Sequence, residues 1–378
     1  MKALVLLAVV ACGKPKGPPA PPTDLDRIAL TVPTAGSPIT LPPLAGAAQL
    51  ALDLAPGVHI VADLSEPTHG DSKNLTWLGT TPSHGTVVLT LADGDLMGTV
   101  FEGNRMYRIL TIEGKTFSIP IAGHRWPGHD VPYKHGIVLP KQAYDGPIEL
   151  IVGYTPLAKQ HCAPIKTLIQ HAVDLTNAVA KNTGVETRFH LADIYLATDY
   201  TETDHSMPEI VEDFEGSDDI YLNEVHQRRH DHHADLAVLF IAGSKSAYVG
   251  LSGETTATHD TAFSVVECTS AVQYLTMTHE IGHLLGLNDD IDIPAQSTFP
   301  YGFGYAHDSD DATQRWRTVM SSGAGCGTDD CPLIPYWSNP KISFEGSATG
   351  IPDASETQRV YPDTEGPASQ FEHGHPFF

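Results

Sequence analysis

The hydrophobic and polar positions of this 378-residue chain form two patterns, one before residue 140 and one from residue 148. In the first pattern, short β-prone runs are separated by turn signals such as Asp93-Gly94. The runs are residues 86–91, 98–101, 106–110 and 116–119. Short strands joined by tight turns predict an antiparallel meander, so we expect residues 24–140 to form a separate β-rich unit.

In the second pattern, strands and helices alternate. A β-rich run over residues 148–154 precedes residues 164–181, where apolar side chains recur at helical spacing. The segment Asn182-Thr183-Gly184 is a stop signal for this helix. A strand over residues 189–195, an acidic helical stretch near residues 217–229 and an apolar strand over residues 236–241 are expected to follow. Alternating strands and helices predict an α/β (α+β) unit with a mostly parallel sheet.

The most specific chemistry in the chain lies beyond these strands. His279, Glu280 and His283 form an H-E-x-x-H pattern, and residues four apart on a helix have Cβ atoms about 5–6 Å apart on one face. Both histidines can therefore reach one zinc ion, whose bonds to nitrogen are about 2.0–2.1 Å long. Glu280 lies beside them, where it can take a proton from water and pass it to a leaving amine. The alternative is a buried amphipathic helix that carries the pattern by chance.

A turn and a third candidate ligand follow the second histidine. Gly286 comes three positions after His283, where a helix that stops and folds back needs a residue tolerant of positive φ. The turned chain then delivers Asp289. An aspartate oxygen binds zinc at about 2.0–2.2 Å, and two histidines with one carboxylate are an established catalytic ligand set.

This arrangement resembles the extended zinc motif of the metzincin proteases, in which the third ligand position usually holds histidine. Asp289 departs from that pattern in the way that the snapalysins do. The segment Thr318-Val319-Met320-Ser321 resembles the metzincin Met-turn, which implies that Met320 lies beneath the zinc ligands. A lone methionine is otherwise usually core filler. Asp290 matches an aspartate that often follows the third ligand, and we expect it to be structural support.

The resemblance covers about residues 148–355. Two segments, residues 149–159 and 326–350, resemble the bacterial peptidyl-Asp metalloendopeptidases and related reprolysin-like metzincins. Residues 233–239 resemble their central strand, and residues 262–266 resemble their edge strand ahead of the zinc helix. The implied fold is a metzincin-type catalytic domain with a twisted, mostly parallel sheet, preceded by a small antiparallel β domain.

The resemblance implies a zinc-dependent endopeptidase that acts on proteins or peptides and is made as a zymogen, and the beginning of the chain predicts that this zymogen is tethered to a membrane. Residues 148–355 are then the catalytic domain, and residues 24–140 are a propeptide-like domain that assists folding and masks the site. The alternative is a surface lipoprotein that binds a partner and keeps the fold without turnover. The intact Glu280 favours the enzyme, because that residue is needed only for proton transfer.

Substrate contacts are implied for three residues. The peptidyl-Asp family prefers to cut before acidic residues, which requires a basic group in the pocket just beyond the scissile bond. Arg315 and Arg317 lie near the Met-turn and could supply it, although Leu333 stands where the resembled segment often carries a basic residue. Tyr336 is expected to line the pocket or to donate to the tetrahedral oxyanion.

The beginning of the chain predicts export. Residues 1–11 resemble a signal peptide with a nine-residue apolar stretch, too short to span a bilayer. Cys12 ends this stretch in a bacterial lipobox pattern, and residues 12–23 form a Pro-rich tether. We therefore expect a bacterial cell-envelope lipoprotein, periplasmic or at the cell surface, anchored through a lipid on Cys12. The alternative is an ordinary signal peptide and a secreted protein.

The remaining cysteines predict disulfides in an oxidising compartment. Without Cys12, an even number remains, namely Cys162, Cys268, Cys326 and Cys331. Cys326 and Cys331 are expected to close a small loop after the Met-turn, which leaves Cys162 with Cys268. Four cysteines allow three connectivities, and a second zinc site is the rival use, although no C-x-x-C spacing supports it.

Latency of the expected zymogen needs a group other than a thiol, because no cysteine lies between Cys12 and Cys162. His124, Trp126, His129 and Asp130 are a candidate plug for the zinc site. The alternative is that they are ordinary loop residues, since spacing alone does not define such a plug.

The composition and net charge of the chain limit the classes of partner that it can bind. With 41% hydrophobic residues the chain can bury two cores, and its net charge of −24 makes nucleic-acid binding improbable. The acidic clusters Asp308-Ser309-Asp310-Asp311 and Asp329-Asp330 are candidate structural calcium sites, with solvated loops as the alternative. We expect a monomer that ends in a C-terminal tail over residues 356–378.

Overall fold

The computed structural model describes residues 36–71, 74–112, 114–121, 134–144, 146–217, 221–292, 298–326 and 331–372. The predicted signal peptide, Cys12 and the tether lie outside these residues, as do His124, Trp126, His129 and Asp130. Within the described ranges, no helix is long and apolar enough to cross a bilayer.

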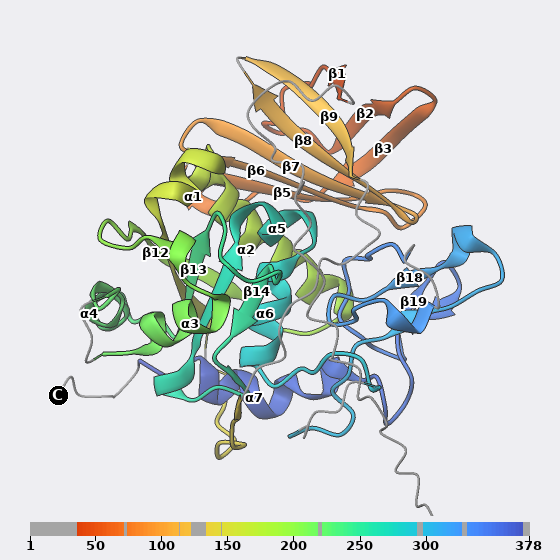
Figure 1. The fold of residues 1–378 in the computed structure, drawn as a ribbon. Coiled ribbons are helices and arrows are strands. Elements are labelled where there is room, and N and C mark those ends of the chain that lie inside the picture. The colour runs from red at the N-terminus through yellow and green to blue at the C-terminus, as the bar shows by residue number, and fades with distance from the viewer. Residues whose placement is uncertain are drawn as a thin grey trace, which may run out of the picture.

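The N-terminal unit is a nine-stranded antiparallel sheet, drawn in red to orange in Figure 1. Its last four strands form the predicted meander, and each pairs with the next through a tight turn. Five strands precede the meander, and the sequence analysis did not predict them. The strands are β1 (Ser37–Ile39), β2 (Gln49–Ala55), β3 (Val58–Leu64), β4 (Thr68–Asp71), β5 (Asn74–Thr80), β6 (Thr86–Ala92), β7 (Asp95–Glu102), β8 (Arg105–Ile112) and β9 (Lys115–Ile121).

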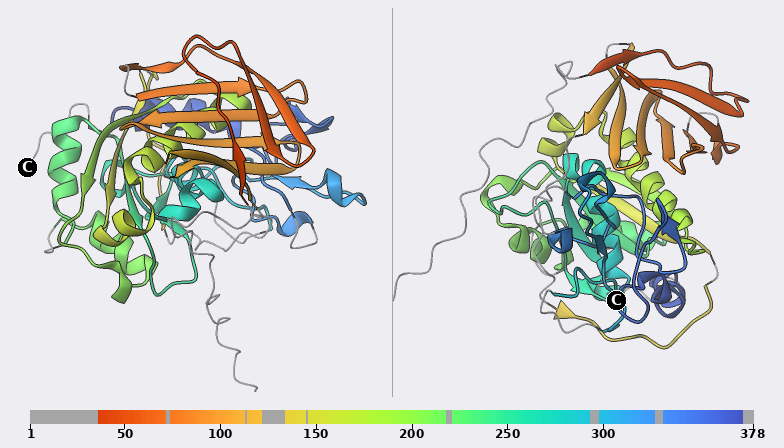
Figure 2. Two further views of the ribbon diagram at one scale, coloured as in Figure 1. Left: turned by 90° about the horizontal axis from the view of Figure 1, so that it is seen from above. Right: turned by 90° about the vertical axis from the view of Figure 1, so that its right-hand side faces the viewer.

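Both faces of the meander are buried, because alternate residues enter two different cores. Val87 and Leu89 of β6 pack inside the curled N-terminal sheet. Val88, between them, joins the main core of the second unit. The sheet therefore lies directly on helix α2 (Ile165–Thr183), as the right-hand view in Figure 2 shows.

The second unit is built on a five-stranded sheet, whose order is β12-β11-β13-β16-β14. Four strands are parallel and β14 is antiparallel, in agreement with the predicted mostly parallel sheet. The predicted central strand is β13, but β16 is an inner strand and β14 is the edge, so the expectation of an edge strand at residues 262–266 is wrong. The strands are β11 (Ile148–Tyr154), β12 (Phe189–Leu196), β13 (Leu236–Ile241), β14 (Gly250–Ser252) and β16 (Phe263–Glu267).

Helices cover both faces of this sheet, which explains why β13 is a continuous apolar run with every residue buried. Val238 and its neighbours on one face pack with α2, α5 (Cys268–Gln273) and α6 (Thr276–Leu284). Leu239 and its neighbours on the other face pack with α3 (Met207–Glu215) and α4 (Glu224–His232). The layers are therefore helix, sheet, helix, with the N-terminal sheet as a fourth layer on α2 (Figure 1).

Two helical predictions need correction. The acidic helix expected near residues 217–229 begins only at Glu224, and α3 precedes it because Ser206 and Glu209 form a capping box. The expected C-terminal tail contains α7 (Tyr361–Ala368), and the Tyr361 ring packs 5.0 Å from that of Trp337. Since Tyr361 belongs to the main core, residues 356–372 are part of the second unit.

Shorter elements complete the structure. Three-residue 3₁₀ helices cover Glu202–Asp204, His259–Thr261, Ala312–Gln314, Ala324–Cys326 and Thr357–Arg359. The remaining elements are α1 (Pro156–His161), β10 (Lys134–His135), β15 (Glu254–Thr255), β17 (Ala306–His307), β18 (Trp316–Arg317), β19 (Ser343–Phe344) and β20 (Ser347–Ala348).

A polar network joins the N-terminal sheet to α2. The fully buried ring of His171 contacts the hydroxyl of Thr90 through Nδ1 and that of Thr99 through Nε2, both at 2.8 Å. Asp174, one helical turn later, accepts from Thr76 at 2.6 Å and from Thr90 at 2.5 Å. Buried polar groups that satisfy one another in this way specify one docking geometry.

The segment between the units runs along the second unit. Its strand β10 pairs in parallel with β15, and Gly136 donates to the carbonyl of Thr255 at 2.7 Å. Further on, the Lys141 ammonium lies 3.1 Å from the Asp363 carboxylate. Residues 134–144 therefore extend from β15 to α7.

Candidate metal centre and active site

Helix α6 carries His279 and His283 into the interior, and all nine of its residues are buried. The two imidazole rings lie 4.6 Å apart, and each histidine is only 1% exposed. The helical spacing predicted from the sequence is thus present. A buried pair of adjacent imidazoles is uncommon in a core unless it binds a shared partner.

The end of α6 turns the chain back toward the histidines. Leu287 donates to the carbonyl of Gly282, and Gly286 donates to that of His283, both at 2.8 Å. This pair of bonds is the Schellman motif, which needs a left-handed residue after the cap. Gly286 has φ +90°, and a Cβ there would lie 2.8 Å from the Phe299 ring. The predicted turn therefore depends on glycine for two reasons, conformation and space.

The turn brings Asp289 to the two histidines. Its Oδ1 atom lies 3.3 Å from Nε2 of His279 and 3.6 Å from Nε2 of His283. Asp289 is 4% exposed, so three buried donor atoms converge at one point from two segments of chain.

Both rings are oriented by backbone carbonyls. Nδ1 of His279 donates to the carbonyl of Val319, and Nδ1 of His283 donates to that of Leu287, each at 2.9 Å. Because a carbonyl only accepts, each Nδ1 carries the proton and each Nε2 presents a lone pair. This tautomer is the one in which a histidine binds a metal through Nε2.

The donor set fits zinc. One ligand atom from each of His279, His283 and Asp289 lies within 4.8 Å of the others, the separation expected of atoms sharing an ion through bonds of about 2.0–2.2 Å. Two imidazoles and one carboxylate leave a fourth position for water or substrate, as catalytic zinc sites do.

The predicted Met-turn lies against α6. Met320 is fully buried, and a Cβ atom on Gly282 would be 2.6 Å from its sulfur. Val319, the residue before it, supplies the carbonyl that holds His279. Asp290 accepts from the amide of Ser322 at 2.9 Å, and also from its hydroxyl, which ties the third-ligand segment to the chain after Met320.

Glu280 faces the edge strand of the sheet. The Ser252 hydroxyl lies 2.8 Å from Oε2 of Glu280, and a Cβ on Gly250 would lie 2.4 Å from Oε1. The sequence analysis missed both residues of β14. They lie about one strand and one helix upstream of the H-E-x-x-H pattern, and no local motif marks them.

Arg317 is placed differently from the expectation of a substrate-pocket residue, whereas the role of Tyr336 stays a prediction. Arg317 is fully buried, and its Nη1 donates to the carbonyl of Ser321 at 2.8 Å, so its guanidinium does not line an open pocket. Burial lowers the pKa of Arg317 to about 10, against the opposing charge of Asp290. The ring of Tyr336 packs 5.9 Å from that of Phe344 in a small aromatic cluster, and burial raises its pKa.

The cysteines pair as the sequence analysis preferred, Cys162 with Cys268 and Cys326 with Cys331. The first pair links the end of α1 to the start of α5, just before the zinc helix.

Asp308, Asp310 and Asp311, the calcium candidates that the structure describes, belong to no group of three possible metal ligands. Among the residues described, the three-ligand groups are the metal centre and one that contains the Cys162–Cys268 disulfide. Asp308 lies 3.2 Å from Nε of Arg315, and Asp311 caps the 3₁₀ helix Ala312–Gln314. Asp329 and Asp330 lie outside the described residues.

Comparisons with known proteins agree with this geometry. The model of the Metallo-peptidase family M12 matches residues 153–332. A peptidyl-Asp metalloendopeptidase of Stenotrophomonas maltophilia is 29% identical over 76% of this chain and 70% of its own length. One of Xanthomonas campestris is 28% identical over 78% and 72%. A Bacteroides fragilis metalloproteinase aligns over 80% of this chain and 87% of its own with 10% identity, but its TM-score of 0.46 is too low to establish a shared fold.

The family match covers the segment that contains the two histidines, Asp289 and Met320, and the relatives extend the similarity over most of the chain. Such a family implies a catalytic metal, which the buried donor set accommodates. The chain is therefore a zinc metalloendopeptidase, similar to the peptidyl-Asp metalloendopeptidases of these bacteria.

Proposed function

We propose that this chain hydrolyses peptide bonds with one zinc ion held by His279, His283 and Asp289, and with Glu280 as general base and then general acid. The observation that carries the proposal is the convergence of the three ligand atoms, with both Nδ1 protons directed to backbone carbonyls. When bound, zinc acts as a Lewis acid toward a water molecule and toward the substrate carbonyl.

Glu280 is the residue that accepts and then donates the proton in the proposed reaction. The Ser252 hydroxyl lies 2.8 Å from Oε2 and 2.9 Å from the backbone carbonyl of Glu280, which holds this side chain against β14, and the carboxylate accepts a proton from the attacking water. The same carboxyl then gives the proton to the departing amine. The close approach of Gly250 excludes a side chain from that position of β14, where any larger residue would displace the carboxylate.

We propose that an extended segment of a protein or peptide is the substrate and that it binds along β14. This strand is the edge of the sheet and is the one that contacts Glu280. The edge strand of a sheet can pair with an extended peptide through main-chain hydrogen bonds, and the three residues of β14 are themselves buried. The buried Asp289 should make the zinc a weaker Lewis acid than a third histidine would, because it adds negative charge to the site.

We propose that the protein is made as a zymogen and that the segment over residues 134–144, rather than the N-terminal sheet itself, obstructs the site. The sheet packs on α2. The segment pairs with β15, and the next residue, Thr256, donates to the carbonyl of His283 at 2.9 Å. The strand β10 therefore pairs with residues directly next to Thr256, which contacts helix α6.

We propose that a lipid on Cys12 anchors the protein to the cell envelope and that the Pro-rich tether separates it from the membrane. The support is the lipobox pattern and the composition of residues 12–23. Treatment of intact cells with labelled lipid precursors tests this, since label in the wild type and none in Cys12→Ser is the expected result.

The activity is tested by mass-spectrometric mapping of cleavage in a mixed peptide library. The full chain with Cys12→Ser is used, with and without a zinc chelator, beside Glu280→Gln. Cleavage that is abolished by both the chelator and the substitution is expected. A chain that binds zinc but cleaves nothing, even after the N-terminal unit has been removed by proteolysis, would favour a silent binding protein.

The same cleavage map shows which residues the enzyme prefers beside the bond that it cuts. The relatives are named peptidyl-Asp metalloendopeptidases, and cleavage beside acidic residues would extend that preference to this chain. The buried Arg317 does not supply the required charge from an open pocket, so a preference for acidic residues would direct attention to other cations.

A further inference from the structure

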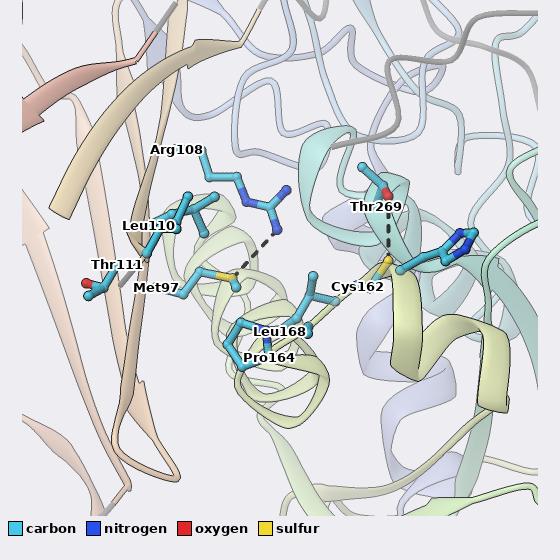
Figure 3. A pocket seen from close by; sticks show the side chains of 11 residues that line it. Met97, Arg108, Leu110, Thr111, Cys162, Pro164, Leu168 and Thr269 are labelled. Carbon is cyan, nitrogen blue, oxygen red and sulfur yellow. Dashed lines mark hydrogen bonds between the residues drawn. The ribbon is translucent and has the colours of Figure 1, made fainter. Parts of the chain in front are cut away.

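A cavity lies between the N-terminal sheet and the second unit, away from the metal centre (Figure 3). Met97 and Leu110 line it from the sheet, and Pro164 and Leu168 line it from the start of α2. The cavity has a volume of about 40 Å³. A cavity that holds one water molecule needs a volume of about 10–15 Å³. The cavity therefore has room for a small group and not for a peptide.

Arg108 of β8 is the charged wall of this cavity. Arg108 is only 4% exposed. Its Nη2 lies 3.7 Å from the sulfur of Met97, and a thioether sulfur is a weak hydrogen-bond acceptor. Nε has no hydrogen-bond partner in the described part of the chain. A buried guanidinium with so little compensation is costly, because a buried charge requires both a counter-charge and hydrogen-bond acceptors.

Glu267, the acidic group whose charge acts on Arg108, makes its hydrogen bonds to other residues. Glu267 caps α5 by accepting from the amides of Thr269 at 3.0 Å and Ser270 at 2.8 Å. Burial lowers the pKa of Arg108 to about 10, and the charge of Glu267 opposes this at a distance. Arg108 therefore stays protonated at neutral pH.

The opposite wall offers a second donor. Thr269 lines the cavity, and its hydroxyl lies 3.6 Å from the sulfur of Cys162. Since Cys162 is in a disulfide, the sulfur has no proton and is only a weak acceptor. The Thr269 proton can thus turn toward a better acceptor in the cavity at little cost.

We propose that this cavity binds a chloride-sized monovalent anion, held by Arg108 from the N-terminal sheet and by Thr269 from the second unit. The apolar walls and the small volume favour a weakly hydrated halide over larger oxyanions. Because the two donors belong to different units, anion binding stabilises the docked state of the N-terminal sheet by mass action. The site is independent of the proposed catalysis.

The test is the thermal unfolding of the full chain in sodium chloride and in sodium gluconate, whose anion is too large for the cavity, at equal ionic strength. A saturable rise in Tm with chloride is expected for the wild type, and Arg108→Gln should lose most of it. Arg105→Gln removes an exposed cation from the same strand and should keep the full rise. Equal Tm values in both salts, or an unchanged chloride effect in Arg108→Gln, would overturn the proposal.

A second measurement serves if Arg108→Gln does not fold. Chloride-35 NMR detects exchange with a protein site as line broadening beyond that of the free ion. The wild type should broaden the line saturably, and Thr269→Val should reduce the effect several-fold. Absence of broadening by the wild type, or full broadening by Thr269→Val, contradicts the assignment.

Discussion

Gly282 and Met320 are in such close contact that a Cβ atom on the glycine would lie 2.6 Å from the methionine sulfur. Gly282 is on α6 between the two histidines, and Met320 follows the residue whose carbonyl orients His279. The absence of a side chain at position 282 therefore sets the distance between the metal helix and the Met-turn.

Gly282→Ala should destabilise the protein although alanine is the better helix former. Overpacking of a rigid core costs about 1–3 kcal/mol, and the gain in helix propensity offsets about 1 kcal/mol of it. We expect a net loss of about 1 kcal/mol in urea denaturation.

A double substitution tests the cause of that loss. In the background of Met320→Ala the added methyl group meets no sulfur, so Gly282→Ala should become neutral or stabilising. Equal losses in both backgrounds would show that the two residues are not coupled.

Asp289→Ala should lower the affinity for zinc at least tenfold, because it removes one of three proposed ligands. Asp290→Ala is the matched control, since its carboxylate contacts Ser322 rather than the two histidines. Zinc content after dialysis against a weak chelator measures both. Similar losses in the two variants would argue against Asp289 as a direct ligand.

Ser252→Ala should lower kcat by about tenfold while KM changes little. The Ser252 hydroxyl orients the carboxylate of Glu280, and a well-placed general base contributes about 10²–10⁴-fold to the rate. Ser264→Ala, at another buried serine paired with Ser252 across the sheet, is the control. A rise in KM without a change in kcat would place Ser252 in substrate binding instead.

His171 should make the protein sensitive to acid. Burial lowers its pKa to about 3, with Asp174 opposing and Arg108 adding to the shift, whereas an unfolded histidine has a pKa of about 6.5. The unfolded state therefore binds a proton below about pH 6.5 that the folded state refuses. The free energy of unfolding should fall by about 1.4 kcal/mol per pH unit, or about 2 kcal/mol at pH 5.

Urea denaturation between pH 8 and pH 5 measures this effect. His171→Gln is expected to remove the slope, even if its stability at pH 8 is lower. His161→Gln, at an exposed histidine, should leave the slope in place. A wild-type stability that is constant over this range would contradict the prediction.

In the N-terminal sheet, the local sequence predicts the hairpins, whereas the burial of the second face depends on the tertiary structure. The turns at Asp93-Gly94 and Gly103-Asn104 specify the hairpins β6–β7 and β7–β8 by themselves. They do not reveal that the second face of the sheet is buried, because Val88 and Thr90 have the same alternation as residues of any half-buried strand. Their partners, including His171, lie far away on α2.

The expectation that the guanidinium of Arg317 faces an open pocket failed for a similar reason. Arg317 is near the Met-turn in sequence, and a cation there is usually solvated. The structure buries it because Ser321, four positions on, turns its carbonyl back to the guanidinium. The edge position of β14 and the packing of α7 likewise depend on distant strands and on Trp337.

The sequence by itself determined the chemistry of the site. The spacing of His279 and His283 follows from the helical repeat, and Gly286 ends the helix because only glycine tolerates its backbone conformation and its surroundings. The tertiary structure alone decided which atoms surround that chemistry. The carbonyl of Val319 and the hydroxyl of Ser252 reach the site through packing of distant segments, and no local pattern encodes these two contacts.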